Sequence, residues 1–550
     1  MKKWRLKIII VAALVLCFAF AFRISDKYFE IAQSLDIMAS AYRDLNDYYV
    51  DSVDPSKLMQ TGIEAMAQSL DPYTWYFPKD ELSDLNFETT GKYGGVGISI
   101  QKTHDAIVVS DVVENGPFAN AGIHTGDFIL SLDDTPVNKL SMDQIAGLLK
   151  GDPGTSLNTK ILHAGNDKIT DYKIIRQEID IPAVSYAGLA APGIGYIKIG
   201  QFTEGTADEV SAAYQKIKQE HPELKGLMID LRGNPGGLMI EALQTANLFL
   251  PQGDTIMSTR GRLPEWDHVY TADLKPMDTR IPLVVLVNGG SASASEIVAG
   301  AMQDLDRGVI VGRRSFGKGL VQTTRNLPYD TKIKFTVAKY YTPSGRCIQS
   351  IDYSQDNNEG YVSLIPDSLK KDFHTKDGRI VRSAGGIMPD KVVSKDSLSN
   401  VAGALITGDY FFDFATQYYY KHPVEPALGK FYLSEDDFNR FLHFLKDKHF
   451  TYQTGSEDAL QNFRDVAKQE GSFNAIKDDY QAMYAKVKQQ QNQDLMTHKH
   501  EIMQLLADEI MSRYYYQRGR IAQQLPADKV VKVAVNLLND TTEYHQLLNN

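Results

Sequence analysis

Cysteine is almost absent from this chain of 550 residues, which contains only Cys17 and Cys347. Cys17 lies within an apolar N-terminal run, so a single cysteine remains for the rest of the chain and no disulfide framework can form. The sequence also contains no Cys-x-x-Cys pair and no His-Glu-x-x-His motif. The fold must therefore depend on core packing, and the sequence implies neither a metal nor another cofactor.

Positively charged residues are fewer than negatively charged ones, which gives a formal net charge of −11 at pH 7. No basic run with interleaved aromatic residues occurs, whereas proteins that hold nucleic acid present a basic field to the phosphates. The charge pattern therefore argues against a nucleic-acid partner. The 43% of hydrophobic and 23% of charged residues are typical of a globular protein, here long enough for several domains.

Long apolar runs are missing except for one at the N-terminus. "MKKWRLK" carries four positive charges and precedes an uncharged stretch from Ile8 to Phe22. An apolar stretch of about 15 residues behind a basic segment is typical of a secretory signal and is shorter than a spanning helix of about 20 residues. We expect residues 1–25 to be a signal peptide or membrane anchor. The protein is then exported, either soluble in the periplasm or anchored to the inner membrane by this segment.

Residues 26–90 are predicted to form an N-terminal helical region. Apolar residues from Ile31 to Tyr49 recur at spacings of three and four, which is one face of a helix, and Pro72 interrupts the pattern. From about residue 91, alternating apolar residues and Gly-Asp turns indicate strands. A short amphipathic helix follows, with Ser141 as its expected N-cap. Residues 91–178 are therefore predicted to be a compact β-rich unit.

The stretches "GGVGI" and "GPFANAGIHTGDFILSLD", with the helix that ends at Lys150, are arranged as in a PDZ domain, which this unit resembles. A glycine-rich loop can turn successive backbone N–H groups towards a peptide's terminal carboxylate, and the peptide then adds a strand to the sheet. Its last side chain would enter an apolar pocket. The expected peptide-binding residues are Gly95, Val96, Gly97, Ile98, Ile100, Ile145 and Leu148.

Residues 179–395 are predicted to form an α/β core, because strands such as "LKGLMIDLRG" and "PLVVLVN" alternate with helices. Residues 396–550 are rich in tyrosine, glutamine and charge at helical spacing, so we expect a helical C-terminal extension. Its two Tyr-Tyr-Tyr runs are expected to pack between helices. Ligands in α/β folds bind where strands end and helices begin, which directs attention to those corners.

Two such corners carry unusual sequence, "LRGNPGG" and "NGGSASASE". A serine at a helix start can lie beside backbone N–H groups able to hold an oxyanion, but it needs a base to become a nucleophile. The spacing does not choose among Ser291, Ser293 and Ser295. The candidate base is the lysine of "SFGKGLVQ", a role that requires the neutral amine; His221 and His268 stay open.

These blocks occur in a characteristic order: "LDPYTWYF", the PDZ-like unit, "LRGNPGG", "SASASEIVAGAMQD", "SFGKGLVQ", "YYTPSGRCIQ" and "GGIMPD". This order resembles the carboxyl-terminal processing proteases, also called tail-specific proteases, over residues 28–393. The resemblance implies a multidomain α/β fold, in which a PDZ domain is inserted into a crotonase-like α/β spiral protease core. It further implies a Ser–Lys dyad. The roles that it assigns are nucleophile to Ser293, general base to Lys318, orientation of that lysine to Gln322, and oxyanion N–H donors to Ala294 and Gly237, with Gly236 as a third candidate.

We therefore predict an exported serine endopeptidase that acts on protein substrates with apolar C-termini. Three alternatives stay open: a non-catalytic PDZ scaffold on a protease-like fold, a crotonase-type acyl-CoA enzyme, and acylation at Ser315. The last rests on Ser-x-x-Lys, the motif of penicillin-binding enzymes, although no Lys-Thr-Gly partner is present. Membrane anchoring is undecided, and so is assembly into a homo-oligomer or with an adaptor through residues 396–550.

Overall fold

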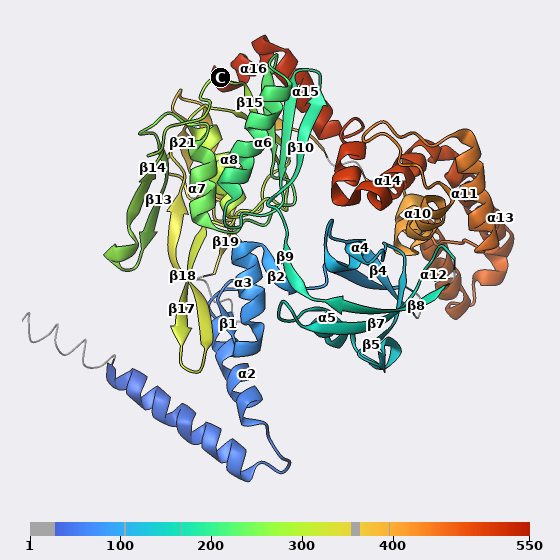
Figure 1. Cartoon of the computed structure of the whole chain (residues 1–550), viewed down its shortest axis with the longest axis horizontal. Helices are drawn as coiled ribbons and strands as arrows, with labels where there is room; N and C mark the ends of the chain where they lie inside the picture. The colour runs from blue at the N-terminus through green and yellow to red at the C-terminus, as the bar shows by residue number, and fades with distance from the viewer. Residues whose placement is uncertain (1–27, 104–105, 167, 354–362, 395–396, 550) are drawn as a thin grey trace, which may run out of the picture. The chain divides into compact units, whose positions relative to one another are not determined.

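A computed structural model describes residues 28–549, except for 104–105, 167, 354–362 and 395–396 (Figure 1). The predicted signal or anchor at residues 1–25 lies outside the described residues. The chain forms two compact units, one of Met1–Leu82 with Gln322–Thr336 and the other of Ser83–Val321 with Val337–Asn550. In the described part of the chain, no helix combines the length and apolar character that crossing a membrane requires.

The smaller unit begins with the helices that the apolar spacing predicts. A helix over residues 28–48 precedes α2 (Pro55–Gln68). Asp54 caps α2 by accepting the N–H of Ser56 at 2.9 Å. The short strand β1 (Trp75–Phe77) pairs antiparallel with residues 332–334 of β18, which runs over Thr331–Tyr341.

The predicted PDZ domain, in the larger unit, is an antiparallel sheet in the order β3-β4-β5-β7-β8, with α4 and α5. Ser141 caps α5 through a capping box with Gln144, as the sequence predicts. A two-stranded ribbon of β2 and β9 flanks this sheet. The bounds are β2 (Lys92–Gly95), β3 (Ile98–Thr103), β4 (Ala106–Val112), α4 (Pro117–Asn120), β5 (Phe128–Leu132), α5 (Met142–Leu149), β7 (Ser156–Leu162), β8 (Ile169–Ile175) and β9 (Gln177–Asp180).

The predicted protease core is built on a sheet in the order β10-β11-β12-β15-β16-β23, parallel from β11 to β23. Its central strands are wholly buried, as expected for a parallel sheet covered on both faces. The strands are β10 (Val184–Ala191), β11 (Ile194–Ile199), β12 (Gly226–Asp230), β15 (Leu283–Val287), β16 (Val309–Gly312) and β23 (Lys391–Val392). Helices α6 (Thr206–Glu220), α7 (Met239–Asn247) and α8 (Ala294–Asp304) pack in the cluster on one face.

The second face of this sheet is covered from the far end of the chain. Helices α15 (Lys529–Asn539) and α16 (Thr541–Asn549) place Leu537, Leu538 and Tyr544 in one apolar cluster with alternate residues of the core strands (Figure 1). The hydroxyl of Tyr544 also bonds the backbone of Leu283 at the start of β15. The last helices of the C-terminal extension therefore complete the α/β core.

The remaining helices form an all-helical region with its own aromatic core. They are α9 (Asn400–Thr407), α10 (Tyr410–Lys421), α11 (Glu435–Asp447), α12 (Gly455–Gln469), α13 (Phe473–Thr497) and α14 (Lys499–Gln524). On the other side of the core, β13 (Thr255–Gly261) pairs with β14 (His268–Thr271) and with residues 338–341 of β18. A helical C-terminal region thus follows the α/β core, as predicted.

Candidate active site

Ser293 stands at the corner between β15 and α8, directly before the first residue of the helix. Its backbone has φ 53° and ψ −112°, a conformation that a residue with a side chain rarely adopts. Such strain persists only where the surroundings impose it, and it is concentrated at functional sites. The corner therefore presents Ser293 in a conformation that local preference alone would not select.

Burial separates the three serines that the sequence leaves equivalent. Ser291 and Ser295 are both fully buried. Ser291 donates its hydroxyl to the carbonyl of Leu231 at 2.8 Å, and Ser295 donates to the carbonyl of Asn234 at 3.0 Å. Ser293 alone of the three is partly exposed. The outer serines thus tie the corner to the loop after β12, and the middle one is left where a substrate can reach it.

The predicted oxyanion donors differ in whether their N–H groups already have a hydrogen-bond partner. The N–H of Ala294 begins α8, where helix amides lack intrahelical acceptors, and Gly237 lies in the neighbouring loop. Neither N–H has a hydrogen-bond partner among the described residues. The N–H of Gly236, by contrast, donates to the side-chain carbonyl of Asn234 at 2.8 Å. Of the three predicted oxyanion donors, the geometry therefore favours Ala294 and Gly237 over Gly236.

A buried carboxylate, Glu296, joins the two halves of the candidate site. Its Oε2 accepts the N–H of Ser293 at 3.0 Å and the N–H of Lys318 at 2.8 Å. Its Oε1 accepts the N–H of Gly317 at 2.7 Å and the hydroxyl of Ser315 at 2.5 Å. One side chain thereby fixes the backbone of the predicted nucleophile and that of the predicted base, which are far apart in the sequence.

Glu296 was not singled out by sequence reasoning, although a signal for it exists. Ser-x-x-Glu is the capping-box pattern, in which the fourth residue accepts the N–H of the first. Ser293 and Glu296 form that contact at the start of α8. The sequence could thus have predicted the local contact, but not the further contacts with residues 315–318.

Burial governs the electrostatics of this carboxylate. Glu296 has no solvent-exposed surface, and desolvation raises its pKa to about 7. The hydrogen bonds from Ser315, Lys318, Gly317 and Ser293 act in the opposite direction, since each stabilises the ionised form. The group therefore titrates within the physiological range while holding the backbone of the site.

Lys318 lies in the loop before β17 (Leu320–Leu327), two residues short of the strand. Gln322, by contrast, belongs to β17, and its amide donates to Thr336 at 3.2 Å. Ser315 is buried, and its hydroxyl, besides donating to Glu296, accepts the N–H of Ile387 at 2.6 Å. These contacts make Ser315 a structural residue and disfavour it as a nucleophile.

The histidines that the sequence left open lie elsewhere. His221 ends α6, which leads into the N-terminal end of β12, whereas Ser293 follows the C-terminal end of β15. Parallel strands place these ends at opposite edges of the sheet. His268 is an exposed residue of the β13–β14 hairpin. Neither position supports a role as the base for Ser293.

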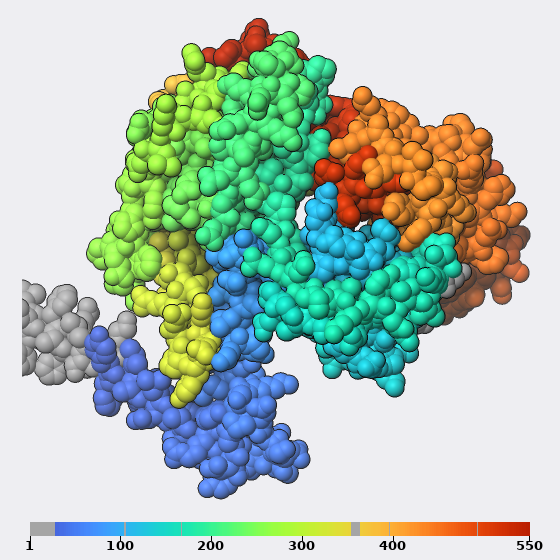
Figure 2. Space-filling model, viewed as in Figure 1, coloured from blue at the N-terminus to red at the C-terminus, as the bar shows by residue number. Residues whose placement is uncertain are grey.

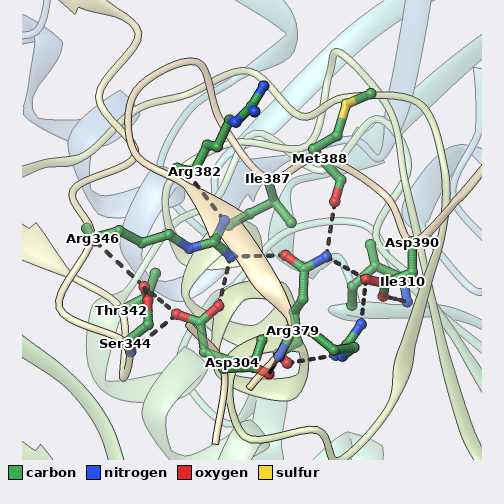
Figure 3. A network of polar contacts seen from close by, with 12 residues as sticks. Asp304, Ile310, Thr342, Ser344, Arg346, Arg379, Arg382, Ile387, Met388 and Asp390 are labelled. Carbon is green, nitrogen blue, oxygen red and sulfur yellow. Dashed lines mark hydrogen bonds and ion pairs between the residues drawn. The ribbon is translucent and has the colours of Figure 1, made fainter. Parts of the chain in front are cut away.

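The far end of α8 is anchored by a buried ionic network (Figure 3). Asp304, the last residue of the helix, pairs with Arg346 at 2.6 Å, and both are 1% exposed. Gln303 accepts from Arg346 at 2.8 Å and donates to Asp390 at 2.8 Å, and Asp390 also pairs with Arg379 at 2.7 Å. Breaking such a pair is costly because it leaves a charge buried alone. The network fixes the helix whose other end begins directly after Ser293.

The predicted peptide-binding residues gather between β3 and α5. Ile98, Ile100 and Leu148 are partly buried against the PDZ core, whereas Val96 and Ile145 are fully buried within it. β3 is the outermost strand of its sheet and pairs, among the described residues, only with β4. An edge strand of this kind can accept a further strand.

Three segments of the chain match described protein families. Residues 193–357 match "Peptidase family S41", 94–174 match "PDZ domain", and 401–538 match "Probable PDZ-protease, C-terminal helical domain". A "Carboxy-terminal-processing protease" of Bartonella bacilliformis is 38% identical over 333 residues, which are 60% of this chain and 75% of the relative. The chain belongs to the carboxy-terminal-processing proteases of peptidase family S41.

Other relatives of this protease cover a similar share of the chain. A "Probable CtpA-like serine protease" of Staphylococcus haemolyticus is 31% identical over 341 residues, covering 61% of this chain and 67% of the relative. Among solved structures, "Photosystem II D1 C-terminal processing protease" is 26% identical and covers 65% of this chain and 92% of its own, with a TM-score of 0.34. The protein is thus a serine-type peptidase with a PDZ domain, a protease core and a C-terminal helical domain.

Proposed function

We propose that this peptidase cleaves proteins through a dyad of Ser293 and Lys318. The neutral amine of Lys318 takes the proton of the Ser293 hydroxyl as the serine oxygen attacks the scissile carbonyl. The protonated amine then gives that proton to the leaving nitrogen, and an acyl-enzyme remains. Water, deprotonated in turn by Lys318, attacks the ester and releases Ser293. The observation that carries this proposal is the Glu296 carboxylate, which accepts the N–H of both residues.

In this proposal, two backbone N–H groups stabilise the negative charge of the tetrahedral intermediate. The N–H groups of Ala294 and Gly237 would donate to the oxyanion, which such donors stabilise more strongly than the ground-state carbonyl. Gln322 would hold the amine of Lys318. The partly exposed position of Ser293 and the open amides beside it support this assignment.

The PDZ domain would capture the C-terminus of the substrate. A chain end with an apolar last residue would pair with β3, its carboxylate on the backbone of Gly95, Val96 and Gly97, and its side chain between Ile98 and α5. The edge position of β3 supports this. We further propose that the protein is exported, with residues 1–25 as the signal or anchor. N-terminal sequencing of the mature protein from separated membrane and soluble fractions tests that assignment.

The test of the dyad is cleavage of an unfolded protein that ends in apolar residues. We expect Ser293→Ala and Lys318→Met to abolish cleavage, and the matched variants Ser258→Ala and Lys339→Ala, both on strands of the neighbouring sheet, to retain it. A fluorophosphonate should label the parent at Ser293, as peptide mass mapping reveals. Undiminished cleavage by Ser293→Ala would refute the nucleophile, and turnover of an acyl-CoA ester would instead favour a crotonase-type activity.

A further inference from the structure

The PDZ domain is docked on the C-terminal helical region through a sharp turn in α14. Tyr515 and Tyr516 break the helix, with Tyr516 at φ 54° and ψ −148°. Glu509 pairs with Arg513 at 2.8 Å and also with Arg520 at 2.7 Å. Glu509 and Arg520 are eleven residues apart, about 16 Å along a straight helix, so the chain must fold back between them. We call residues 515–519 the α14 turn.

The α14 turn reaches the PDZ domain with three consecutive side chains. Tyr516 packs against the PDZ hydrophobic cluster and is the one member of that cluster, in the described part of the chain, from outside the domain. Gln517 donates to Asp111 at 3.2 Å, and Arg518 pairs with Glu114 at 3.7 Å. Tyr514 and Tyr515 of this run pack in the core of the helical region, as the sequence predicts, whereas Tyr516 serves domain docking.

A second contact joins α10 to the turn before β5. The hydroxyl of Tyr420 donates to Asp127 at 2.9 Å, and a side chain at Gly126 would clash with Thr416. Asp127 is fully buried, but it also accepts the N–H of Ala164 at 3.0 Å and contacts His163 at 2.8 Å. Asp127 therefore keeps most of its partners if α10 moves away.

The composition of this interface suits reversible docking. Arg518 and Glu114 are about half exposed, and an ion pair at such a surface contributes little more than a few-fold to an equilibrium. Tyr516 supplies the apolar anchor from a strained backbone conformation. The ring of His124 also lies against tyrosines at the end of α10. Figures 1 and 2 show α10 and α14 beside α4 and β4.

The far end of the peptide groove lies against the same helical region. Gln101 of β3 donates to Asp409, at the start of α10, at 3.4 Å. If the last residue of a bound chain lies beside Ile98 of β3, the fourth residue from its end lies beside Gln101. Because side chains alternate along a strand, Gln101 lies on the opposite face from Ile98 and Ile100. The fourth residue of the bound chain would thus project towards α10.

We propose that the helical region is a latch on the PDZ domain. The α14 turn and α10 hold the domain docked in the resting enzyme, and a chain end long enough to pass Gln101 competes with α10 and releases it. This inference rests on the proposed capture of chain ends by β3. A ligand that binds only the undocked form shifts the population towards it, and its apparent affinity is reduced by the docked fraction.

The test compares two peptides with the same apolar end, of three and ten residues, binding to the full-length Ser293→Ala protein, measured by calorimetry. Tyr516→Ala should tighten binding of the ten-residue peptide by roughly fivefold or more, since the docked fraction falls, and should leave the three-residue peptide unchanged. Tyr432→Ala, at a tyrosine of the same region that is 80% exposed, is the matched control and should change neither.

Unchanged or weaker binding of the ten-residue peptide to Tyr516→Ala would overturn the latch. Tyr516 packs against the PDZ core, so its replacement could disturb folding. A variant at the surface tests the latch without that risk. Arg518→Glu should also tighten binding of the longer peptide, and Glu114→Arg in the same molecule should reverse the effect. If the parent binds neither peptide, the proposed capture of chain ends by β3 is wrong. The proposal that a bound chain end releases the latch is then wrong too.

Hydrogen exchange reports the docking without any dependence on peptide affinity. Arg518→Glu should increase exchange in the α14 turn and in residues 122–127, and the charge swap should restore protection. Equal exchange in the parent and Arg518→Glu would mean that the domain does not undock through this contact. Saturating ten-residue peptide should raise exchange at the α14 turn of the parent, and its failure to do so would separate peptide binding from docking.

Discussion

Replacing Glu296 with glutamine tests whether this carboxylate positions the active site. The carboxylate offers two acceptor oxygens to four donors. The amide of glutamine has the same shape but only one acceptor oxygen, so two donors lose their partners. Each unsatisfied buried donor costs about 1–3 kcal/mol. The variant also removes a buried charge, which offsets part of this cost, and we expect it to fold.

The expected loss is in turnover. The N–H groups of Ser293 and Lys318 share Oε2, so disturbance of that oxygen moves the nucleophile and the base relative to each other. A misplacement of about 1 Å lowers a rate by about 10²-fold. We expect kcat of Glu296→Gln to fall by roughly that factor and KM to change little.

The pH dependence separates this role from simple packing. Burial raises the pKa of Glu296 to about 7, so the carboxylate gains a proton and loses acceptor capacity as the pH falls through that value. Activity of the parent should fall over the same range. The free energy of unfolding should change in the opposite direction, because the folded state binds the proton of Glu296 more tightly than the unfolded chain does. The stabilisation by this proton is therefore present at acid pH and is lost as the pH rises through about 7. The shift corresponds to roughly 3 kcal/mol.

The assay is kcat/KM against pH, with urea unfolding at the same pH values. The kcat/KM of Glu296→Gln should not show the increase near pH 7 that the parent shows. Any increase of kcat/KM with pH that remains in the variant belongs to another group. Glu241→Gln is the matched control, because Glu241 is also buried and accepts the N–H of Gly205 and Ala207 at the start of α6. It should change stability without changing the pH profile. A Glu296→Gln enzyme with unchanged kcat and the same increase near pH 7 would refute the reasoning.

Three further outcomes are expected. Gly237→Ala should lower kcat/KM by at least about 10²-fold, because a side chain there would overlap the carbonyl of Phe202 and displace an oxyanion donor; unchanged kinetics would exclude Gly237. Arg346→Met should lower the free energy of unfolding by about 3–5 kcal/mol in urea, since Asp304 would be left buried and unpaired. Leu538→Ala should cost about 2–5 kcal/mol, and a smaller loss would argue against α15 as part of the protease core.

The sequence predicted most of the parts of this protein because they are encoded locally. Apolar spacing indicated the N-terminal helices and the alternation of the core, and Ser141 was correctly predicted as an N-cap. The serine and lysine blocks directed attention to Ser293 and Lys318. The choice between them and their neighbours came from the resemblance, and the geometry adds that Ser291, Ser295 and Ser315 are buried and committed to other contacts.

Long-range contacts could not be predicted in this way. Nothing in the sequence indicated that the helices after residue 528 would cover the protease sheet, because an amphipathic helix does not specify which apolar surface it covers. The tyrosine runs were expected to pack between helices. Four of the six tyrosines do so, but the α14 turn sends Tyr516 to the PDZ domain, and Tyr420 of α10 reaches Asp127. The contact of Tyr516 depends on a reversal of the chain that partly buried ion pairs hold.

The sequence by itself determined which side chains are available and which local structures carry them: a serine at a helix start, a lysine before a strand, and a glycine-rich loop beside an edge strand. The tertiary structure alone decided what one carboxylate does with them. Glu296 accepts N–H groups from residues 293, 317 and 318, and these meet only once β15, α8 and β17 have packed. Local preferences act over a few residues, whereas a buried charge takes its partners from whatever the fold brings within hydrogen-bond distance.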